Sequence, residues 1–481
     1  ERRDLLLCQR QPRVDETYLP LGEYHAFNPL VARAKQARDL FLIIGPPGTG
    51  KTSFGLLNLL KEELLEQETN ILLLSYTNRA VDEICSKLVE SHIDFLRIGS
   101  ELSCDPAYKD WLLNSKTGKL KRGSEVEQLL AQTRVVCGTT VALNASSELF
   151  SLKHFHLAIV DEASQILEPH LIGLLSAHNG DENAIDRFVL IGDHKQLPAV
   201  VQQSEDESLV TEPDLRHIHL TNCRYSLFER LLKGFKTTQG YDPRYVYMLT
   251  RQGRMHTAIA DFPSRQFYEG KLQIVPLAHQ QLQPQPCASA NGITRILSLR
   301  NVAFVDAPAP ESSVNDKTNQ VEAEMIAATI HQIYLLTRST EKEFSTDHTV
   351  GVIVPYRNQI ATIRGAIDRL GIAVLHNILI DTIERFQGSQ KDYIVYGFTI
   401  QRPYQLDFLT SNVFVEDGQQ IDRKLNVAMT RARLHLLLIG NSRLLKKSKV
   451  FAELLSYLRQ QQSYFAPTPE DYCNGKFSLT D

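Results

Sequence analysis

The sequence predicts an α/β protein with two successive domains, each built on a parallel β-sheet flanked by helices. Short apolar runs recur along the chain, bounded by polar residues or glycine. The first series lies at 40–44, 70–76, 134–140, 156–163 and 187–193, and the second lies at 302–307, 349–356, 378–383, 392–400 and 434–441. Helical patterns such as 54–67 and 319–336 separate the runs. Such runs are typical of buried parallel strands, and alternation of strands with helices indicates parallel sheets.

We divide the chain accordingly into four regions. They are an N-terminal lead-in at 1–39, a first domain at 40–245, a second domain at 246–465 and a C-terminal tail at 466–481. Residues 98–133 are predicted to be a polar excursion from the first sheet. The chain opens at Glu1 without a methionine, so we expect the lead-in to be truncated and the chain to be part of a longer polypeptide.

Composition excludes several classes of protein. The 481 residues are 43% apolar, which is too apolar for a disordered chain, and the net charge is -4, which excludes a polycation. No two of the seven cysteines form a CxxC pair, so neither a zinc site nor a disulfide framework is indicated. We expect a reducing compartment, cytoplasmic or nuclear. No apolar run approaches the roughly 20 residues of a membrane span, so no membrane association is expected.

A phosphate-binding loop follows the first apolar run. The segment "GPPGTGKT" fits the pattern G-x-x-x-x-G-K-[ST] and precedes a helical pattern, which is the context that this motif requires. Its residues are Gly45, Pro46, Pro47, Gly48, Thr49, Gly50, Lys51 and Thr52. Backbone N–H groups and Lys51 would bind phosphate oxygens, and Thr52 would hold Mg²⁺. The sequence therefore predicts a nucleoside triphosphate site.

Two adjacent carboxylates end a later strand, in the segment "IVDEAS". Asp161 is predicted to be a second Mg²⁺ ligand, and Glu162 is predicted to accept a proton from the attacking water. Together with the phosphate loop, this pair predicts hydrolysis of the nucleotide.

Six sequence blocks then occur in a characteristic order. They are "GPPGTGKT", "DEASQ", "GDHKQLPAVV", "QGRMH", "ERFQGSQKD" and "LNVAMTRAR", and they extend over about residues 40 to 445. In this order the chain resembles the superfamily 1 helicases, above all the branch that includes the nonsense-mediated-decay RNA helicase and the nuclease-helicase of Okazaki-fragment maturation. The resemblance implies two RecA-like domains with ATP between them, single-stranded DNA or RNA across both, and 5′→3′ movement.

The resemblance also implies roles for residues that contact the nucleotide. Gln196 would sense the γ-phosphate and contact the attacking water. Arg431 would act as an arginine finger, and Arg254 would meet the γ-phosphate when the domains close. Gly388 would allow the backbone to approach the ligand.

Two further nucleotide contacts each leave an alternative open. By resemblance Tyr356 would stack on the adenine, although a tyrosine here is also compatible with plain packing. Glu384 would contact the ribose, or it would be an ordinary surface carboxylate. The sequence departs from the family at Gly253, where an aromatic residue is usual, and at Val31, where a glutamine that reads the adenine is usual. Base specificity therefore stays undetermined.

Hydroxyl and amide side chains follow two of the predicted strands. They are Ser75, Thr77, Asn78, Thr139 and Thr140. At the carboxyl ends of strands such groups can bind a phosphate backbone without many positive charges, so we predict that they contact nucleic acid. Asn78 could instead cap the helix that follows it.

The sequence thus predicts a monomeric, ATP- and Mg²⁺-dependent helicase or translocase on single-stranded nucleic acid. One alternative is a P-loop ATPase switch that remodels a protein or ribonucleoprotein partner. Another is the motor portion of a larger nuclease-helicase. Preference for DNA or RNA and the biological pathway are left open.

Overall fold

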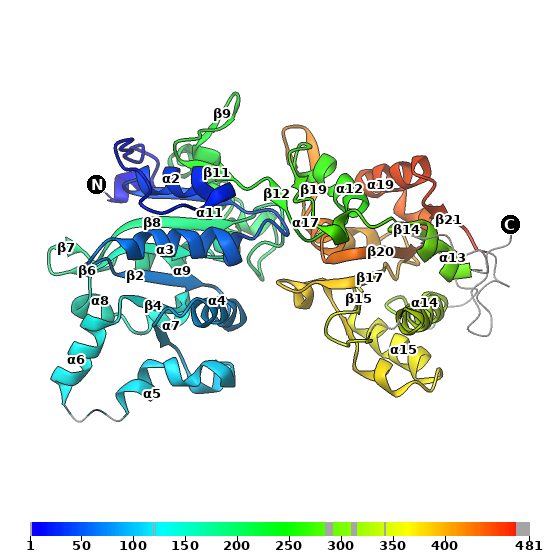
Figure 1. Ribbon diagram of the computed structural model, residues 1–481. Helices are drawn as coiled ribbons and strands as arrows, with labels where there is room; N and C mark the ends of the chain where they lie inside the picture. Colours follow the sequence, from blue (N-terminus) through cyan, green and yellow to red (C-terminus); the bar gives the residue numbers. More distant parts are fainter. Residues whose placement is uncertain are drawn as a thin grey trace. The chain divides into compact units, whose positions relative to one another are not determined.

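The computed structural model describes residues 2–118, 120, 122–283, 292–308, 315–340 and 343–467. The chain forms two compact units (Figure 1). The first comprises Glu1–Pro46, Gly50–His194 and Pro198–Leu249, and the second comprises Pro47–Thr49, Lys195–Leu197 and Thr250–Asp481. The predicted tail at 466–481 lies outside the described residues from 468 onward.

The first unit is built on a seven-stranded sheet in which all neighbouring strands are parallel. Its order is β11 (Val246–Met248), β1 (Leu40–Ile44), β8 (Ile185–Gly192), β5 (Phe155–Val160), β2 (Ile71–Ser75), β4 (Val135–Thr139) and β3 (Leu96–Ile98). Both faces of this sheet are covered, so its strands are mostly apolar. Leu40, Leu42 and Ile44 of β1 enter one core, while Phe41 and Ile43 enter the other.

Helices on the two faces complete these cores. On the Phe41 side lie α2 (Asn28–Gln36), α3 (Leu57–Leu65) and α4 (Asn78–Glu90). On the other side lie α1 (Arg2–Leu6), α9 (Glu168–Leu175) and α11 (Leu227–Gly234). The predicted lead-in at 1–39 is therefore part of the first unit, because α1 and α2 pack into its cores. The excursion at 98–133 contains the end of β3 and the short helices η3 (Glu101–Ser103), η4 (Pro106–Trp111), α5 (Leu113–Thr117) and α6 (Gly123–Gln132).

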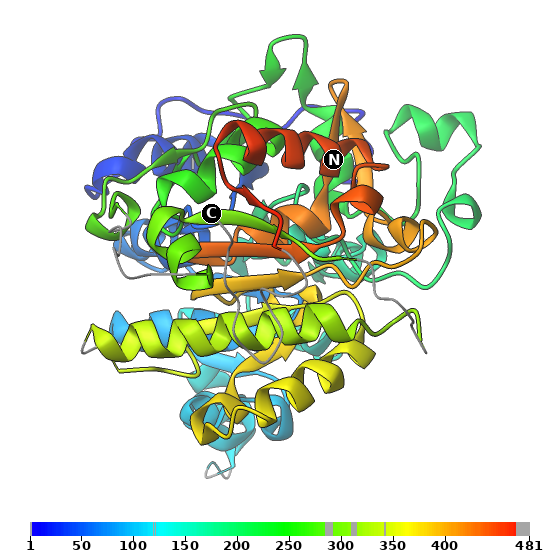
Figure 2. The ribbon, with the colours of Figure 1, turned by 90° about the vertical axis from the view of Figure 1, so that its right-hand side faces the viewer.

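The second unit is built on a six-stranded parallel sheet. Its order is β16 (Leu379–Asp381), β15 (Val350–Ile353), β17 (Lys391–Gly397), β20 (Ala432–Gly440), β14 (Val302–Asp306) and β21 (Tyr464–Phe465). Figure 2 shows α14 (Gln320–Ser339) and α15 (Arg357–Asp368), in yellow-green and yellow, on one side of this sheet, and α19 (Lys449–Gln460), in red, on the other. With α19 lie α12 (Thr257–Phe267) and α17 (Arg423–Met429), which contact β20.

Shorter elements connect these layers. They include η2 (Lys51–Leu56), α7 (Thr140–Asn144), η5 (Ala163–Gln165), β12 (Arg251–Gln252), β13 (Gln273–Ile274), η9 (Ile383–Phe386), α16 (Gln405–Leu409) and the hairpin of β18 (Val413–Glu416) and β19 (Gln419–Asp422).

The predicted fold class is confirmed, and each predicted apolar run overlaps a strand of one of the two large sheets. The sequence pattern missed the short strands β3, β11 and β21. The predicted boundary at 245/246 falls just before β11, but β11 pairs with β1 in the first sheet, so the first unit continues to Leu249.

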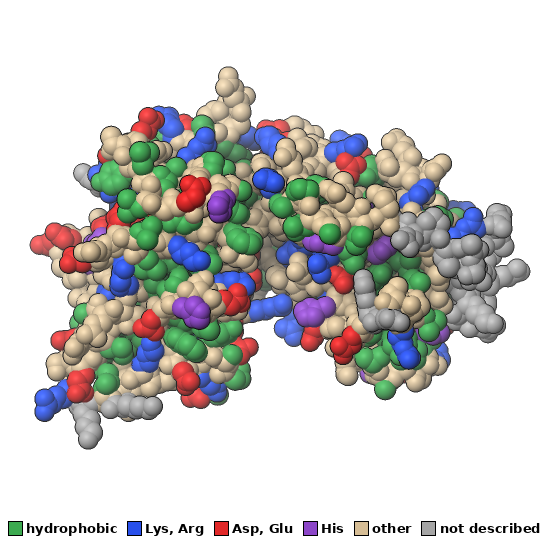
Figure 3. Space-filling model, viewed as in Figure 1, with side chains coloured by type: hydrophobic (Ala, Val, Ile, Leu, Met, Phe, Trp, Pro, Cys, Tyr) green, Lys and Arg blue, Asp and Glu red, His purple; other side chains and the backbone are tan. Residues whose placement is uncertain are grey.

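The surface carries both signs of charge. On the face in Figure 3, Lys and Arg side chains lie among Asp and Glu side chains. Within the described residues, no helix has the length and apolar character needed to cross a membrane.

One buried carboxylate stabilises a strained turn of the second unit. Glu322, in the first turn of α14, is fully buried and accepts hydrogen bonds from Thr399 N at 2.7 Å and from Asn319 Nδ2 at 3.3 Å. Thr399 has φ of 52°, a left-handed conformation that is costly for a β-branched residue. Burial raises the pKa of Glu322 from 4.5 to about 8, and the N–H donors oppose this rise.

We predict a pH-dependent difference in stability between the wild type and Glu322→Gln. Because the folded-state pKa is raised, the stabilisation is present below pH 4.5 and is lost as the pH rises to about 8. The Glu322→Gln variant keeps the same stability contribution at both pH values, because glutamine does not titrate. Urea unfolding at pH 5 and pH 8 should therefore show the free energy of unfolding shifting in favour of the variant at the higher pH. Glu324→Gln, at a half-exposed position of α14, is the matched control, and identical pH dependence in all three proteins would contradict the prediction.

Candidate active site

The loop after β1 has the backbone that a phosphate requires. Gly48 and Gly50 have φ of 75° and 73°, and a Cβ atom on Gly50 would lie 2.7 Å from the Phe54 ring. Only glycine tolerates both constraints, so the loop can turn its N–H groups toward a ligand. A helical segment begins directly afterwards at Lys51, and its N-terminus adds the positive end of a helix dipole. The predicted loop Gly45–Thr52 therefore fits a phosphate group.

Two side-chain oxygens that are suited to bind a metal ion lie close together where this helix begins. Thr52 Oγ1 donates a hydrogen bond of 2.6 Å to Asp161 Oδ2, although the two residues lie 109 positions apart in the sequence. Asp161 follows β5 and is only 2% exposed. Burial, and next the charge of Glu162, raise the pKa of Asp161 to about 6, while Lys51 and Thr52 act in the opposite direction. A hydroxyl and a carboxylate are oxygen ligands that Mg²⁺ prefers, so the donor set fits this ion.

The predicted lysine and the second carboxylate form an ion pair beside these donors. Lys51 Nζ lies 2.6 Å from Glu162 Oε1, and Gln165 Nε2 donates to Glu162 Oε2 at 2.7 Å. Burial lowers the pKa of Lys51, but the carboxylates of Glu162 and Asp161 raise it, and the net change is upward. Lys51 therefore stays protonated. Glu162 itself has φ of 54°, a strained conformation typical of functional sites.

Arg431 of the second unit is buried and donates hydrogen bonds to side-chain and backbone oxygens. It follows α17, is 2% exposed, and donates from Nη2 to Gln196 Oε1 at 2.8 Å. Its Nε donates to Val427 O at 3.2 Å, and its Nη1 donates to Ser389 O at 3.5 Å. The predicted pair Gln196 and Arg431 is thus in direct contact, and Ser389 follows the predicted Gly388, whose φ is 77°.

Arg254 contacts the loop that follows Gly388 and the residue that precedes Arg431. Its Nε donates to Gln390 Oε1 at 2.9 Å, and its Nη1 donates to Thr430 O at 3.2 Å. Gln252 Oε1 accepts from the backbone N–H groups of Arg254 and Met255, at 2.9 and 2.7 Å, and so fixes the turn that carries the arginine. Gln252 and Gln390 were not among the predicted site residues. Their positions inside the quoted sequence blocks were the only signal that could have identified them.

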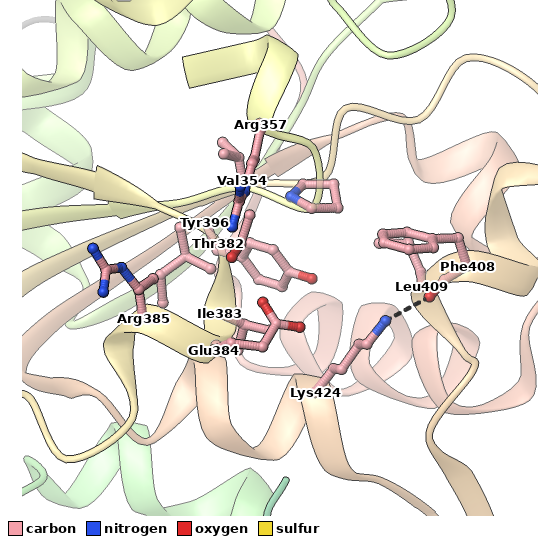
Figure 4. A pocket seen from close by; sticks show the side chains of 12 residues that line it. Val354, Arg357, Thr382, Ile383, Glu384, Arg385, Tyr396, Phe408, Leu409 and Lys424 are labelled. Carbon is pink, nitrogen blue, oxygen red and sulfur yellow. Dashed lines mark hydrogen bonds between the residues drawn. The ribbon is translucent and has the colours of Figure 1, made fainter. Parts of the chain in front are cut away.

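Tyr356 and Glu384 lie elsewhere in the second unit. The ring of Tyr356 stacks on Phe408, with centroids 5.1 Å apart and planes inclined by 20°. Glu384 lines a cavity to which Phe408 also contributes (Figure 4). Among the described residues, neither one contacts Arg254 or Arg431. The adenine and ribose contacts predicted for them remain predictions.

The residues predicted to contact nucleic acid fall into an exposed group and a buried group. Thr77 and Asn78 are exposed at the start of α4. Thr77 Oγ1 accepts from Ala80 N at 3.2 Å, so Thr77 is the helix cap and the alternative that Asn78 caps this helix is wrong.

The other three predicted contacts need correction, because these side chains are buried. Ser75 is 0% exposed and donates to the Asp161 carbonyl at 3.2 Å. Thr140 is also fully buried, and Thr139 is 7% exposed and caps α7 by accepting from Ala142 N at 3.1 Å. Arg79, which the sequence analysis did not single out, is exposed beside Thr77 and Asn78 and is a further candidate for this contact. A basic residue at the amino end of a helix was the signal that could have identified it.

Comparisons with known proteins cover most of the chain. A family described as an AAA domain matches residues 223–443, and a second family with the same description matches residues 28–122 and 107–204. A DNA replication ATP-dependent helicase/nuclease of Xenopus laevis is 28% identical over 456 residues, covering 90% of this chain and 38% of that protein. Its counterpart in Arabidopsis thaliana is 30% identical over 444 residues, covering 90% and 30%. A regulator of nonsense transcripts 1 homolog of Neurospora crassa is 26% identical over 478 residues, covering 90% and 38%.

These matches agree with the ordered sequence blocks and with the geometry of the phosphate loop. The chain spans only 30% to 38% of the length of these relatives. Across that length it matches both the nuclease-helicases and the regulator of nonsense transcripts. The chain therefore belongs to the superfamily 1 helicases, in the branch that contains the Okazaki-fragment nuclease-helicases and the nonsense-mediated-decay helicase.

Proposed function

We propose that this chain is an ATP-dependent helicase or translocase that moves 5′→3′ along single-stranded nucleic acid as a monomer. One observation carries the proposal: Thr52 contacts Asp161 and Lys51 contacts Glu162, so a phosphate loop, a metal-binding pair and a carboxylate base meet at one edge of a sheet. The names of the relatives support helicase activity, and their ATP dependence supports ATP as the nucleotide.

Each residue of the first unit has a chemical task in this proposal. Thr52 and Asp161 would hold Mg²⁺, which when bound neutralises phosphate charge. Lys51 binds phosphate oxygens, which would replace its contact with Glu162. Glu162 is then able to accept a proton from the attacking water, and Gln165 keeps the carboxylate in position.

The arginines of the second unit supply positive charge. Arg431 and Arg254 would stabilise the charge that develops on the transferred phosphoryl group. Gln196 accepts a hydrogen bond from the guanidinium group of Arg431, and Gln390 accepts one from that of Arg254. Gln252 accepts from the backbone N–H of Arg254 and fixes the turn that carries this residue.

We place this activity in the cytoplasm or nucleus. The sulfur atoms of Cys85 and Cys137 lie 3.7 Å apart as free thiols. A reducing compartment keeps such a close pair from oxidising.

The proposal predicts that single-stranded DNA or RNA raises the rate of ATP hydrolysis. Glu162→Gln should retain ATP binding, yet lower turnover by about 100-fold or more because the general base is lost. Lys51→Ala should weaken ATP binding itself. Steady-state ATPase assays and nucleotide titrations measure both quantities. If neither polymer changes wild-type turnover, the chain is better explained as an ATPase that remodels a protein partner.

A second prediction separates the two arginines near β20. Arg431→Lys should lower turnover by about 10³-fold, because an ammonium group cannot reproduce the planar contacts of a transition-state arginine. Arg433→Lys is the matched control, since Arg433 Nη1 forms an ion pair of 2.8 Å with Asp392 that a lysine can partly replace. Single-turnover ATPase measurements with saturating strand provide the comparison. Equal losses in the two variants would remove Arg431 from its proposed role.

A third prediction concerns Arg79. Arg79→Ala should weaken binding of single strands irrespective of their sequence, and should reduce the slope of log affinity against log salt by about 0.7, the value for one phosphate contact on a single strand. Lys87→Ala, in the last turn of the same helix, is the control and should leave the slope unchanged. Fluorescence anisotropy across a salt series measures these slopes, and an unaltered slope in Arg79→Ala would exclude the contact.

A further inference from the structure

A separate cavity of about 370 Å³ lies at the carboxyl ends of β15, β16 and β17 in the second unit (Figure 4). Pro355, Ile383 and Leu409 supply apolar wall, and Thr382, Glu384, Tyr396 and Lys424 supply polar groups. The volume is within the range of small-ligand sites, and carboxyl ends of parallel strands are where open α/β sheets bind ligands.

Two polar groups in this cavity make no hydrogen bond within the described part of the chain. Tyr396 is 4% exposed, and Figure 4 shows its hydroxyl directed into the cavity. The Glu384 carboxylate faces the same space. Tyr396 is largely buried and its hydroxyl has no hydrogen-bond partner among the described residues, so a ligand in the cavity is the partner that its direction favours.

Lys424 supplies a positive charge opposite Glu384. It is 8% exposed, and its Nζ donates to Phe408 O and to Ser411 Oγ, each at 2.9 Å. An ammonium group has three N–H donors, so one is left for a ligand. Burial lowers the pKa of Lys424 below its ordinary value, and the charges of Glu384 and Asp422 oppose this change only in part.

This set of groups has a definite hydrogen-bonding pattern. A carboxylate accepts two parallel N–H donors best, and beside it an ammonium and a hydroxyl can donate to an oxygen. Guanine has the complementary groups on one edge: its N1–H and N2–H groups can donate to the carboxylate, and the adjacent O6 can accept from the ammonium and the hydroxyl. The corresponding edges of adenine, cytosine and thymine each pair a single donor position with acceptors, and so leave one carboxylate oxygen unpaired.

We propose that this cavity binds one guanine base, with Glu384 accepting from its N1–H and N2–H groups and Lys424 and Tyr396 hydrogen-bonded at O6. The base could belong to a bound single strand, in which case the inference rests on the proposed function, or to a free guanine nucleotide. Arg357, exposed at the rim, provides a charge for the attached phosphate. In this assignment Glu384 binds a base in place of the ribose contact predicted from family resemblance.

The test compares oligonucleotides that differ at one base. Fluorescence anisotropy without ATP gives the Kd of an all-dT strand, of the same strand with one dG, and of the same strand with one deoxyinosine, which lacks the 2-amino group. We expect the dG strand to bind at least about fivefold more tightly than the dT strand, with deoxyinosine between them. Glu384→Gln and Tyr396→Phe should each bring the Kd ratio of the dT and dG strands close to one, whereas the control Glu324→Gln should keep the wild-type ratio.

A calorimetric arm with GMP and AMP distinguishes the source of the base. One outcome is that the protein binds GMP more tightly than AMP, that Glu384→Gln loses this difference, and that the strands show no preference. This outcome supports the guanine site and assigns it to a free nucleotide. Strands that bind without preference, together with no GMP binding, overturn the inference while leaving the proposed function intact. If no strand binds at all, the proposed function fails, and the GMP arm alone decides whether the cavity reads guanine.

Discussion

The first unit depends on the contacts that tie the loop after β1 to the end of β5. These strands are not neighbours, because β8 lies between them in the sheet. Thr52 nevertheless reaches Asp161 at 2.6 Å, and Lys51 reaches Glu162 at 2.6 Å. A buried carboxylate without such partners would carry a large desolvation cost, so the same contacts that stabilise Asp161 also assemble the phosphate chemistry.

The second unit uses a different device to hold its charges ready. Arg431 is as buried as Asp161, and the acceptors described for it are the amide oxygen of Gln196 and two backbone carbonyls. These acceptors fix the direction of the guanidinium group. Two positions later, Arg433 is paired with Asp392 at 2.8 Å, and there the charge serves the fold.

The elements that depend on local sequence patterns, namely the strands and the motifs of the phosphate site, were predictable from the sequence. The strands followed from their apolar runs, and the phosphate loop and the Asp161–Glu162 pair followed from motifs whose spacing is fixed by backbone chemistry. Burial was not predictable in the same way. Ser75 and Thr140 look like exposed polar groups at strand ends, but tertiary packing encloses them, and Arg79, which the motifs do not mark, is left exposed beside Thr77. Likewise Gln252 and Gln390 acquire their roles only through contacts with Arg254.

Phosphate chemistry and base recognition are separable in this fold. Val31, where the family resemblance places a glutamine that reads adenine, is fully buried in the apolar core around α2 and α3. Gly253, where an aromatic ring is usual, donates its backbone N–H to Gly48 O at 2.9 Å. Both positions therefore serve packing and backbone structure. With Val31 and Gly253 at these positions, the residues predicted to bind phosphate and metal keep their contacts with one another, so the geometry of the predicted phosphate site does not depend on a glutamine or an aromatic ring there.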